Sequence, residues 1–163
     1  MMSEQLTHLD ESGRAKMVDV GHKPDSERVA TARGSVAMRP ETLQLIVEGN
    51  LKKGDVFTVA QLAGIMAAKR TSELIPLCHP LALSHVEVTC MPNAPESRVD
   101  IEATVRLRGK TGVEMEALTA VTVAGLTIYD MAKAVDRGMR LTDVYLVRKE
   151  GGESGDWRLE IGD

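Results

Sequence analysis

Hydrophobic and polar residues alternate most regularly between Arg98 and Arg108. Val, Ile, Ala and Leu occupy every second position of this segment, and charged residues or threonine occupy the positions between them. Successive side chains of a β-strand point to opposite faces of a sheet. The period of two therefore predicts a strand with one buried and one exposed face. Residues 82–90 are predicted to form its partner strand, joined to it by a loop over residues 92–95.

The segment before this strand pair predicts one strand and two helices. Residues 28–38 are rich in Val, Thr and Ala, which we interpret as a strand. Pro40 and Gly49 are placed to begin and end a helix over residues 41–48. Asp55 is expected to cap a second helix, which ends near residue 72. Apolar residues recur at helical spacing in that second helix: Val56, Val59, Leu62, Ala63 and Met66.

The C-terminal part of the chain predicts a long helix over residues 113–135, followed by strands over 141–148 and 157–161. The resulting order, β-α-α-β-β-α-β-β, contains the β-α-β-β-α-β arrangement of the ferredoxin-like fold. We therefore predict an α+β protein with an antiparallel sheet and helices packed on one face. Residues 1–16 are polar and lack periodicity, which predicts a mobile arm, and residues 17–163 are expected to form a single domain.

The long helix is apolar on almost all sides, which favours burial in a subunit interface. Most of its polar residues fall within about 80° of one another around the helix axis, with Lys133 about 60° further round. These residues are Glu116, Thr119, Thr127 and Asp130. Asp130 and Lys133 are three residues apart and can touch. A solvated stripe with an ordinary ion pair is the simplest interpretation of this pattern.

The alternative interpretation is a catalytic carboxylate and amine held at the edge of an apolar surface, where burial can shift a pKa. Glu116 and Asp130 lie roughly 21 Å apart along the helix axis at 1.5 Å per residue. One ligand contacts both only if the ligand is long, or if the site combines the Glu116 region of one chain with the Asp130 region of another. The second arrangement favours an oligomer.

Composition narrows the classes of partner. The 163 residues carry 20 Lys and Arg against 24 Asp and Glu, a net charge of −4, and aromatic residues make up only 2%. Proteins that bind single-stranded nucleic acid stack bases on aromatic side chains and present basic surfaces, so no nucleic-acid partner is expected. Carboxylates interrupt the most apolar stretch, residues 113–131, so neither a membrane-spanning helix nor a membrane partner is expected.

The two cysteines, Cys78 and Cys90, provide neither a disulfide framework nor a Cys-x-x-Cys pair for zinc. We therefore expect no metal site. The first residues lack the basic flank and apolar stretch of a targeting segment. Together these features predict a cytoplasmic protein.

Two turns are candidates for part of a functional site. Leu77-Cys78-His79-Pro80 lies between a predicted helix and a predicted strand, where it is either a plain connector or part of a site. Gly109-Lys110-Thr111-Gly112 resembles the end of a P-loop, but Thr104 stands where that motif requires glycine. A glycine-rich turn before a helix can still offer backbone amides to an anion. The residues thus favour an acidic and basic site for a small phosphorylated ligand.

Several motifs, taken together, resemble one known family. The motifs are the Met-Val-Asp-Val segment 17–20, Lys53-Gly54-Asp55, and the segments 67–71, 75–80, 109–120 and 126–135. In this order, and over nearly the whole chain, they resemble the cyclic pyranopterin monophosphate synthase family of molybdenum-cofactor biosynthesis (MoaC). The resemblance implies a ferredoxin-like fold, a homohexamer built as a trimer of dimers, and active sites between subunits. It also implies conversion of a cyclised dihydro-GTP, a nucleotide-derived small molecule, into cyclic pyranopterin monophosphate with release of pyrophosphate. Neither a metal nor a redox cofactor is expected.

The matching positions imply roles for individual residues. Asp130 is expected to be the catalytic acid/base, assisted by Lys133 and Lys53. The residues expected to bind the substrate are Leu77, Cys78, His79, Glu114, Met115 and Glu116, with Arg28 and Lys69 as phosphate contacts. Lys110 is a further candidate for stabilising the triphosphate, from its position alone. A non-catalytic nucleotide-binding module remains an alternative, whereas an RNA-binding domain of this topology requires aromatic residues on its central strands, and residues 98–108 have none.

Overall fold

A computed structural model describes residues 10 and 12–160, and its framework is one antiparallel sheet of five strands. The strands are β1 (Ser26–Ala37), β2 (His85–Asn93), β3 (Arg98–Gly109), β4 (Arg140–Glu150) and β5 (Trp157–Arg158). Their spatial order is β2-β3-β1-β4-β5. Strands β1 to β4 therefore have the spatial order of the ferredoxin-like fold, which confirms the predicted fold class. The mobile arm predicted for residues 1–16 lies mostly outside the described residues.

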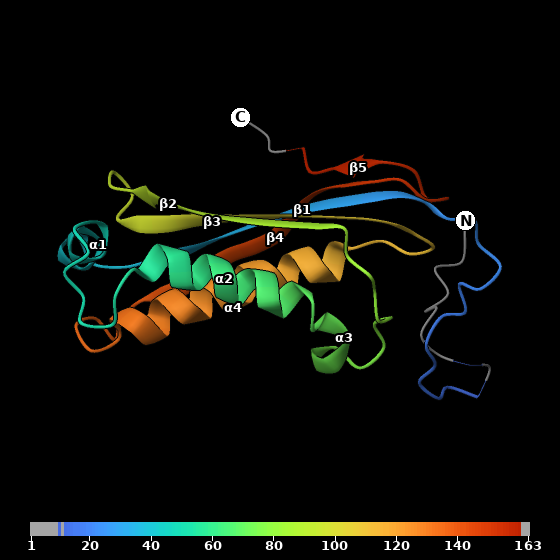
Figure 1. Cartoon of the computed structure of the whole chain (residues 1–163), viewed down its shortest axis with the longest axis horizontal. Helices are drawn as coiled ribbons and strands as arrows, with labels where there is room; N and C mark the ends of the chain where they lie inside the picture. Colours follow the sequence, from blue (N-terminus) through green and yellow to red (C-terminus); the bar gives the residue numbers. More distant parts are fainter. Residues whose placement is uncertain (1–9, 11, 161–163) are drawn as a thin grey trace.

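Two long helices cover one face of the sheet (Figure 1). The helices are α1 (Pro40–Val47), α2 (Val56–Ala68), α3 (Thr71–Leu74) and α4 (Glu114–Ala132). Helix α4 packs on β1, β3 and β4, and α2 packs on β2 and along α4. Helix α1 and the end of α4 lie at one end of the molecule, and α3 lies near the start of α4 at the other end.

The alternation along β3 is confirmed residue by residue. Its apolar side chains are at most 2% exposed and face the helices: Val99, Ile101, Ala103, Val105 and Leu107. The neighbouring strand β1 contributes Ala30, Ala32 and Val36, each 0% exposed. The predicted cap of α2 is also confirmed, because the Asp55 carboxylate accepts a hydrogen bond from Thr58 N at 3.2 Å.

Small residues let α2 and α4 approach each other closely. Ala60, Gly64 and Ala67 are buried in α2, and Ala120 and Ala124 are buried in α4. A Cβ atom added to Gly64 would lie 2.9 Å from the carbonyl oxygen of Ala120. The chain therefore builds this contact from backbone and methyl groups, because only four aromatic residues are present to fill larger gaps.

Helical spacing predicted α2 but not its buried face, because only Val56 of the five spaced residues is buried. The larger apolar side chains Val59, Leu62 and Met66 are 42%, 57% and 46% exposed, while the smaller residues face the core. Helical spacing identified the helix correctly, but it could not tell which of two apolar faces packs inward. Close packing against α4 selects the face that carries glycine and alanine.

Several helices and strands also end at residues other than those predicted. Helix α2 ends at Ala68, before the predicted end near residue 72, and α3 follows it. Helix α4 ends at Ala132, whereas the predicted helix extended to residue 135. Strand β2 runs through Pro92 to Asn93, so the turn to β3 begins later than predicted. The sheet and α2 cover much of α4 within one chain, whereas Leu126 of this helix is 53% exposed, and the predicted subunit interface stays a prediction. Among the described residues, the helices are too short or too polar to cross a membrane.

We expect Gly64→Ala to destabilise the protein, although alanine favours helix by about 1 kcal/mol. The added methyl group meets the Ala120 carbonyl and must push α2 from α4, which should lower the free energy of unfolding by about 1–3 kcal/mol. Urea denaturation at one protein concentration measures this change. Gln61→Ala, on a half-buried position of the same helix, is the control and should stay within about 0.5 kcal/mol of the parent chain.

Candidate active site

A cavity of about 660 Å³ lies at the start of α4. It is bordered by the segment that precedes β1, the 77–81 loop, the first turn of α4 and the loop that follows β4. Eight of the residues singled out from the sequence line it: Arg28, Leu77, Cys78, His79, Lys110, Glu114, Met115 and Glu116. The fold therefore gathers residues from three separate motifs around one space.

Glu116 is the buried acid of this cavity. Its side chain lies in the first turn of α4, and the residue is only 4% exposed. Burial raises the pKa of Glu116 to about 7, because the charged carboxylate loses its hydration. Burial, together with the nearby Glu116, also raises the pKa of the Cys78 thiol. The cavity thus holds a carboxyl group able to exchange a proton near neutral pH, beside a protonated thiol.

Two side chains hold the segment before β1 against the cavity. His79 Nε2 lies 2.7 Å from the carbonyl oxygen of Val18, and Lys110 Nζ donates to the carbonyl oxygen of Gly21 at 2.7 Å. A carbonyl oxygen only accepts, so Nε2 of His79 carries the proton in this contact. In the neutral ring, Nδ1 is then the nitrogen left to accept a hydrogen bond.

Four basic side chains line the same cavity, and sequence reasoning found only two of them. Arg28 and Lys110 were singled out from the sequence, whereas Lys23 and Lys149 were missed. Lys23 pairs with Glu153 at 3.0 Å. A signal for Lys149 was present, since it stands just before the Gly151-Gly152 turn. Four glutamates line the cavity as well, so it offers a ligand both cations and carboxylates: Glu114, Glu116, Glu150 and Glu153.

Gly152, in the loop after β4, makes room for Arg28. The Arg28 guanidinium donates to the carbonyl oxygens of Gly109 and Lys110 at 3.4 and 3.3 Å, and the residue is 9% exposed. Gly152 has φ +87°, and a Cβ added there would collide with the guanidinium. Glycine at this position therefore allows the arginine to stay at the edge of the cavity.

A second cluster lies at the other end of α4. The Asp130 carboxylate contacts Lys133 Nζ at 2.6 Å and Lys53 Nζ at 2.9 Å, and Lys53 also donates to the Asp130 carbonyl oxygen at 2.8 Å. Hydrogen bonds and charge from Lys133, and then from Lys53, lower the pKa of Asp130 to about 2. Asp130 is therefore ionised at neutral pH. The predicted contact between Asp130 and Lys133 is present, and Lys53, which the resemblance placed with Asp130, contacts the same carboxylate.

One chain does not bring the two clusters together. Glu116 is in the first turn of α4 and Asp130 is in its last, roughly 21 Å apart along the axis. Lys69, a predicted phosphate contact, is exposed at the end of α2 and does not line the cavity. Within the described residues, histidine, cysteine and carboxylate side chains form no group of three that could hold a metal ion.

The fold and the site define an α+β protein with a cavity lined by basic and acidic side chains, a buried carboxyl group in that cavity and a separate lysine–aspartate–lysine cluster. Residues 17–152 match the sequence model of the MoaC family, and the chain belongs to this family.

Relatives of similar length carry one name. A protein of Thermomicrobium roseum is 62% identical over 96% of this chain and 94% of its own length. A protein of Rhodospirillum rubrum is 64% identical over 95% of this chain and 93% of its own length. A protein of Roseiflexus sp. is 65% identical over 93% of this chain and 96% of its own length. Each is named cyclic pyranopterin monophosphate synthase.

The pKa of Glu116 predicts a pH-dependent stability. Between about pH 4.5 and 7 the folded chain keeps a proton that the unfolded chain releases, so the free energy of unfolding should fall as pH rises. The contribution is about 3 kcal/mol and should be lost above pH 7. Urea denaturation measures the free energy of unfolding across this pH range. In Glu116→Gln this free energy should fall less with rising pH than in the parent chain. Glu41 is an exposed residue of α1, and Glu41→Gln should keep the parent dependence of the free energy of unfolding on pH. The same pH dependence in all three proteins would contradict the raised pKa of Glu116.

We expect Gly152→Ala to weaken binding of inorganic triphosphate by about tenfold, because the methyl group displaces the Arg28 guanidinium. Isothermal titration calorimetry measures the dissociation constant. Gly155→Ala is a matched control, since Gly155 has φ +70° in the same loop but nothing within 4 Å of an added Cβ. Equal losses in both variants would mean that backbone strain, and not Arg28, controls binding.

Proposed function

We propose that this protein is a cyclic pyranopterin monophosphate synthase of molybdenum-cofactor biosynthesis. It converts the cyclised dihydro-GTP intermediate into cyclic pyranopterin monophosphate and releases pyrophosphate. The observation that carries the proposal is the identity of more than 60% to relatives of that name over nearly the full chain. The free thiols Cys78 and Cys90 support a cytoplasmic location for the reaction.

The cavity at the start of α4 supports this chemistry. Opening and closing rings requires several proton transfers, and positioned acids and bases accelerate each by typically 10²–10⁴-fold. Release of pyrophosphate places negative charge on the leaving group, which cations stabilise. Glu116 would exchange a proton in the cavity, while Arg28 and Lys110 would contact the phosphates. Lys69 remains a proposed phosphate contact from the resemblance.

The remaining substrate contacts would come from the loop and the helix that meet at the cavity. Leu77, Cys78 and His79 would line the substrate on one side, and Glu114 and Met115 on the other. His79 would accept a hydrogen bond through Nδ1, because its Nε2 is occupied by the Val18 carbonyl. These contacts would orient the purine-derived rings without aromatic stacking.

The lysine–aspartate–lysine cluster would carry the main acid/base work. Asp130 is ionised, so it would enter the reaction as the proton acceptor. Lys53 and Lys133 contact the Asp130 carboxylate directly and would donate or relay the proton.

We further propose a homohexamer, a trimer of dimers, in which one chain's cavity receives the Asp130 cluster of another. The separation of Glu116 and Asp130 along α4 supports a site shared between subunits. The exposed apolar side chains of α2 support an interface on the helical face: Val59, Leu62 and Met66.

Incubation with the cyclised dihydro-GTP should yield a pterin and one pyrophosphate, which a coupled phosphate assay detects. Asp130→Ala and Lys53→Ala should each lower kcat by about 10²–10⁴-fold, because each removes a proton-transfer group. Lys52→Ala changes an exposed neighbour and should behave like the parent chain. Circular dichroism confirms that each variant is folded.

Two outcomes would contradict the proposal. Normal turnover by folded Asp130→Ala would show that the cluster is not catalytic. Tight binding of the substrate without turnover by the unmodified chain would instead favour a nucleotide-binding module.

A further inference from the structure

The geometry of the Lys53–Asp130–Lys133 cluster needs support from elsewhere in the fold. The three side chains are 49%, 57% and 51% exposed. Ion pairs between exposed groups contribute little, because water screens them and long side chains lose entropy. Whether these side chains contact one another therefore depends on the relative positions of the backbone segments that carry them. Lys53 comes from the connection between α1 and α2, whereas Asp130 and Lys133 lie at the end of α4.

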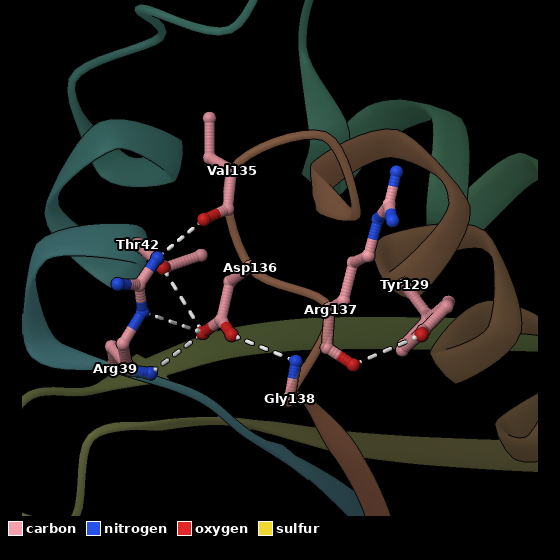
Figure 2. Close-up of polar contacts among 7 residues, drawn as sticks. All are labelled: Arg39, Thr42, Tyr129, Val135, Asp136, Arg137 and Gly138. Carbon is pink, nitrogen blue, oxygen red and sulfur yellow. Dashed lines mark hydrogen bonds and ion pairs between the residues drawn. The ribbon is translucent and has the colours of Figure 1, made fainter.

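One buried carboxylate joins the turn after α4 to the start of α1, the helix that precedes the connection carrying Lys53. Asp136 lies in the turn after α4, and its side chain is 6% exposed. Its Oδ2 accepts hydrogen bonds from Arg39 N at 3.0 Å and from Thr42 Oγ1 at 3.1 Å, and its Oδ1 accepts one from Gly138 N at 3.0 Å (Figure 2). The backbone hydrogen bond from Arg39 is the main cause that holds the pKa of Asp136 below its usual value.

Asp136 acts as the missing cap of α1. Arg39 is the N-cap residue of this helix, and its own side chain makes no capping hydrogen bond. The first backbone N–H groups of a helix need acceptors and favour a nearby negative charge. Asp136 provides both from a position 97 residues away in the chain. The first turn of α1 is thereby fixed to the turn after α4.

The turn that carries Asp136 is itself held at several points. Tyr129 Oη donates to the carbonyl oxygen of Arg137 at 3.1 Å, and the Arg39 guanidinium donates to the carbonyl oxygen of Val135 (Figure 2). The backbone N–H of Lys133 donates to the carbonyl oxygen of Tyr129 at 2.8 Å. Asp136 therefore lies three residues after Lys133, and its hydrogen bonds reach α1, the helix that precedes Lys53.

We propose that Asp136 is a positioning residue, whose tertiary cap on α1 sets the place of Lys53 relative to Asp130. It does not line the cavity at the start of α4 and contacts none of the three cluster side chains, so its effect passes through the backbone. The expected effect of Asp136 on the turnover rate rests on the proposed function. Its expected effect on the contact between Lys53 and Asp130 does not. A misplacement of about 1 Å can cost an enzyme as much as 100-fold in rate.

Asp136→Asn tests this role, because an amide nitrogen cannot accept the hydrogen bonds on one side of the carboxylate. We expect kcat with the cyclised dihydro-GTP to fall about tenfold or more, while KM changes less than about threefold. Thr42→Val removes a single donor and should cause a smaller loss of the same kind, and Thr42→Ser should restore the parent value. Asp100→Asn is the matched control. Asp100 accepts from Ser35 and Asn93, each at 2.9 Å, on the sheet face away from the helices.

Lysine acetylation followed by mass spectrometry gives a readout that does not need activity. Lys53 should react slowly in the parent chain, since its ammonium group is held by Asp130. In Asp136→Asn its rate should rise toward the rate measured in Asp130→Asn. Lys52, exposed in the same loop, should be unchanged. Asp100→Asn should leave both lysines and kcat at their parent values.

Parent-like acetylation of Lys53 in Asp136→Asn would overturn the proposal, and so would an equal rise in Asp100→Asn. If Asp136→Asn does not fold, the comparison of Thr42→Val with Thr42→Ser decides in the same way. A parent chain that releases no pyrophosphate would refute the proposed function alone, because the acetylation rates would still test the role of Asp136.

Discussion

The close contact between α2 and α4 is the constraint on which the rest of the structure depends. Gly64 of α2 lies against the carbonyl of Ala120 in α4, and Figure 1 shows that the two helices run in opposite directions. The start of α2 consequently meets the end of α4, where Lys53 reaches Asp130. A larger side chain at the crossing would separate the helices and, with them, the charged groups that they carry.

The two carboxyl groups on α4 illustrate how environment assigns chemical roles. Glu116 is buried, and the loss of hydration raises its pKa to about 7. Asp130 is exposed, and two lysines lower its pKa to about 2. One helix thus carries a group that can hold a proton at neutral pH and a group that cannot. Sequence reasoning placed both on one polar stripe, but it could not assign their protonation, which depends on burial and on partners from other elements.

Much of the fold was predictable because local rules act over a few residues. Alternation identified β3, and Asp55 marked the start of α2 through its cap. The buried face of α2 was not predictable, because both of its faces are apolar and only contact with α4 chooses between them. In the site, the loop and helix residues of the cavity were found from motifs. Lys23 and Lys149 were missed, because they stand outside those motifs and reach the cavity only in the folded chain.

The sequence by itself determined the order of the strands and of the longer helices, the antiparallel α+β class and the residues with acid/base or anion-binding chemistry, but not the one-turn helix α3. These properties follow from side-chain period, capping and residue type, which are local. Only the tertiary structure decided which of those residues meet. It placed Glu116 and Asp130 at opposite ends of α4, and it connected Lys53 to Asp130 across 77 residues of chain. It also gave Asp136 to Arg39 as a helix cap. Such contacts are set by the packing of whole elements, and no short pattern along the chain records them.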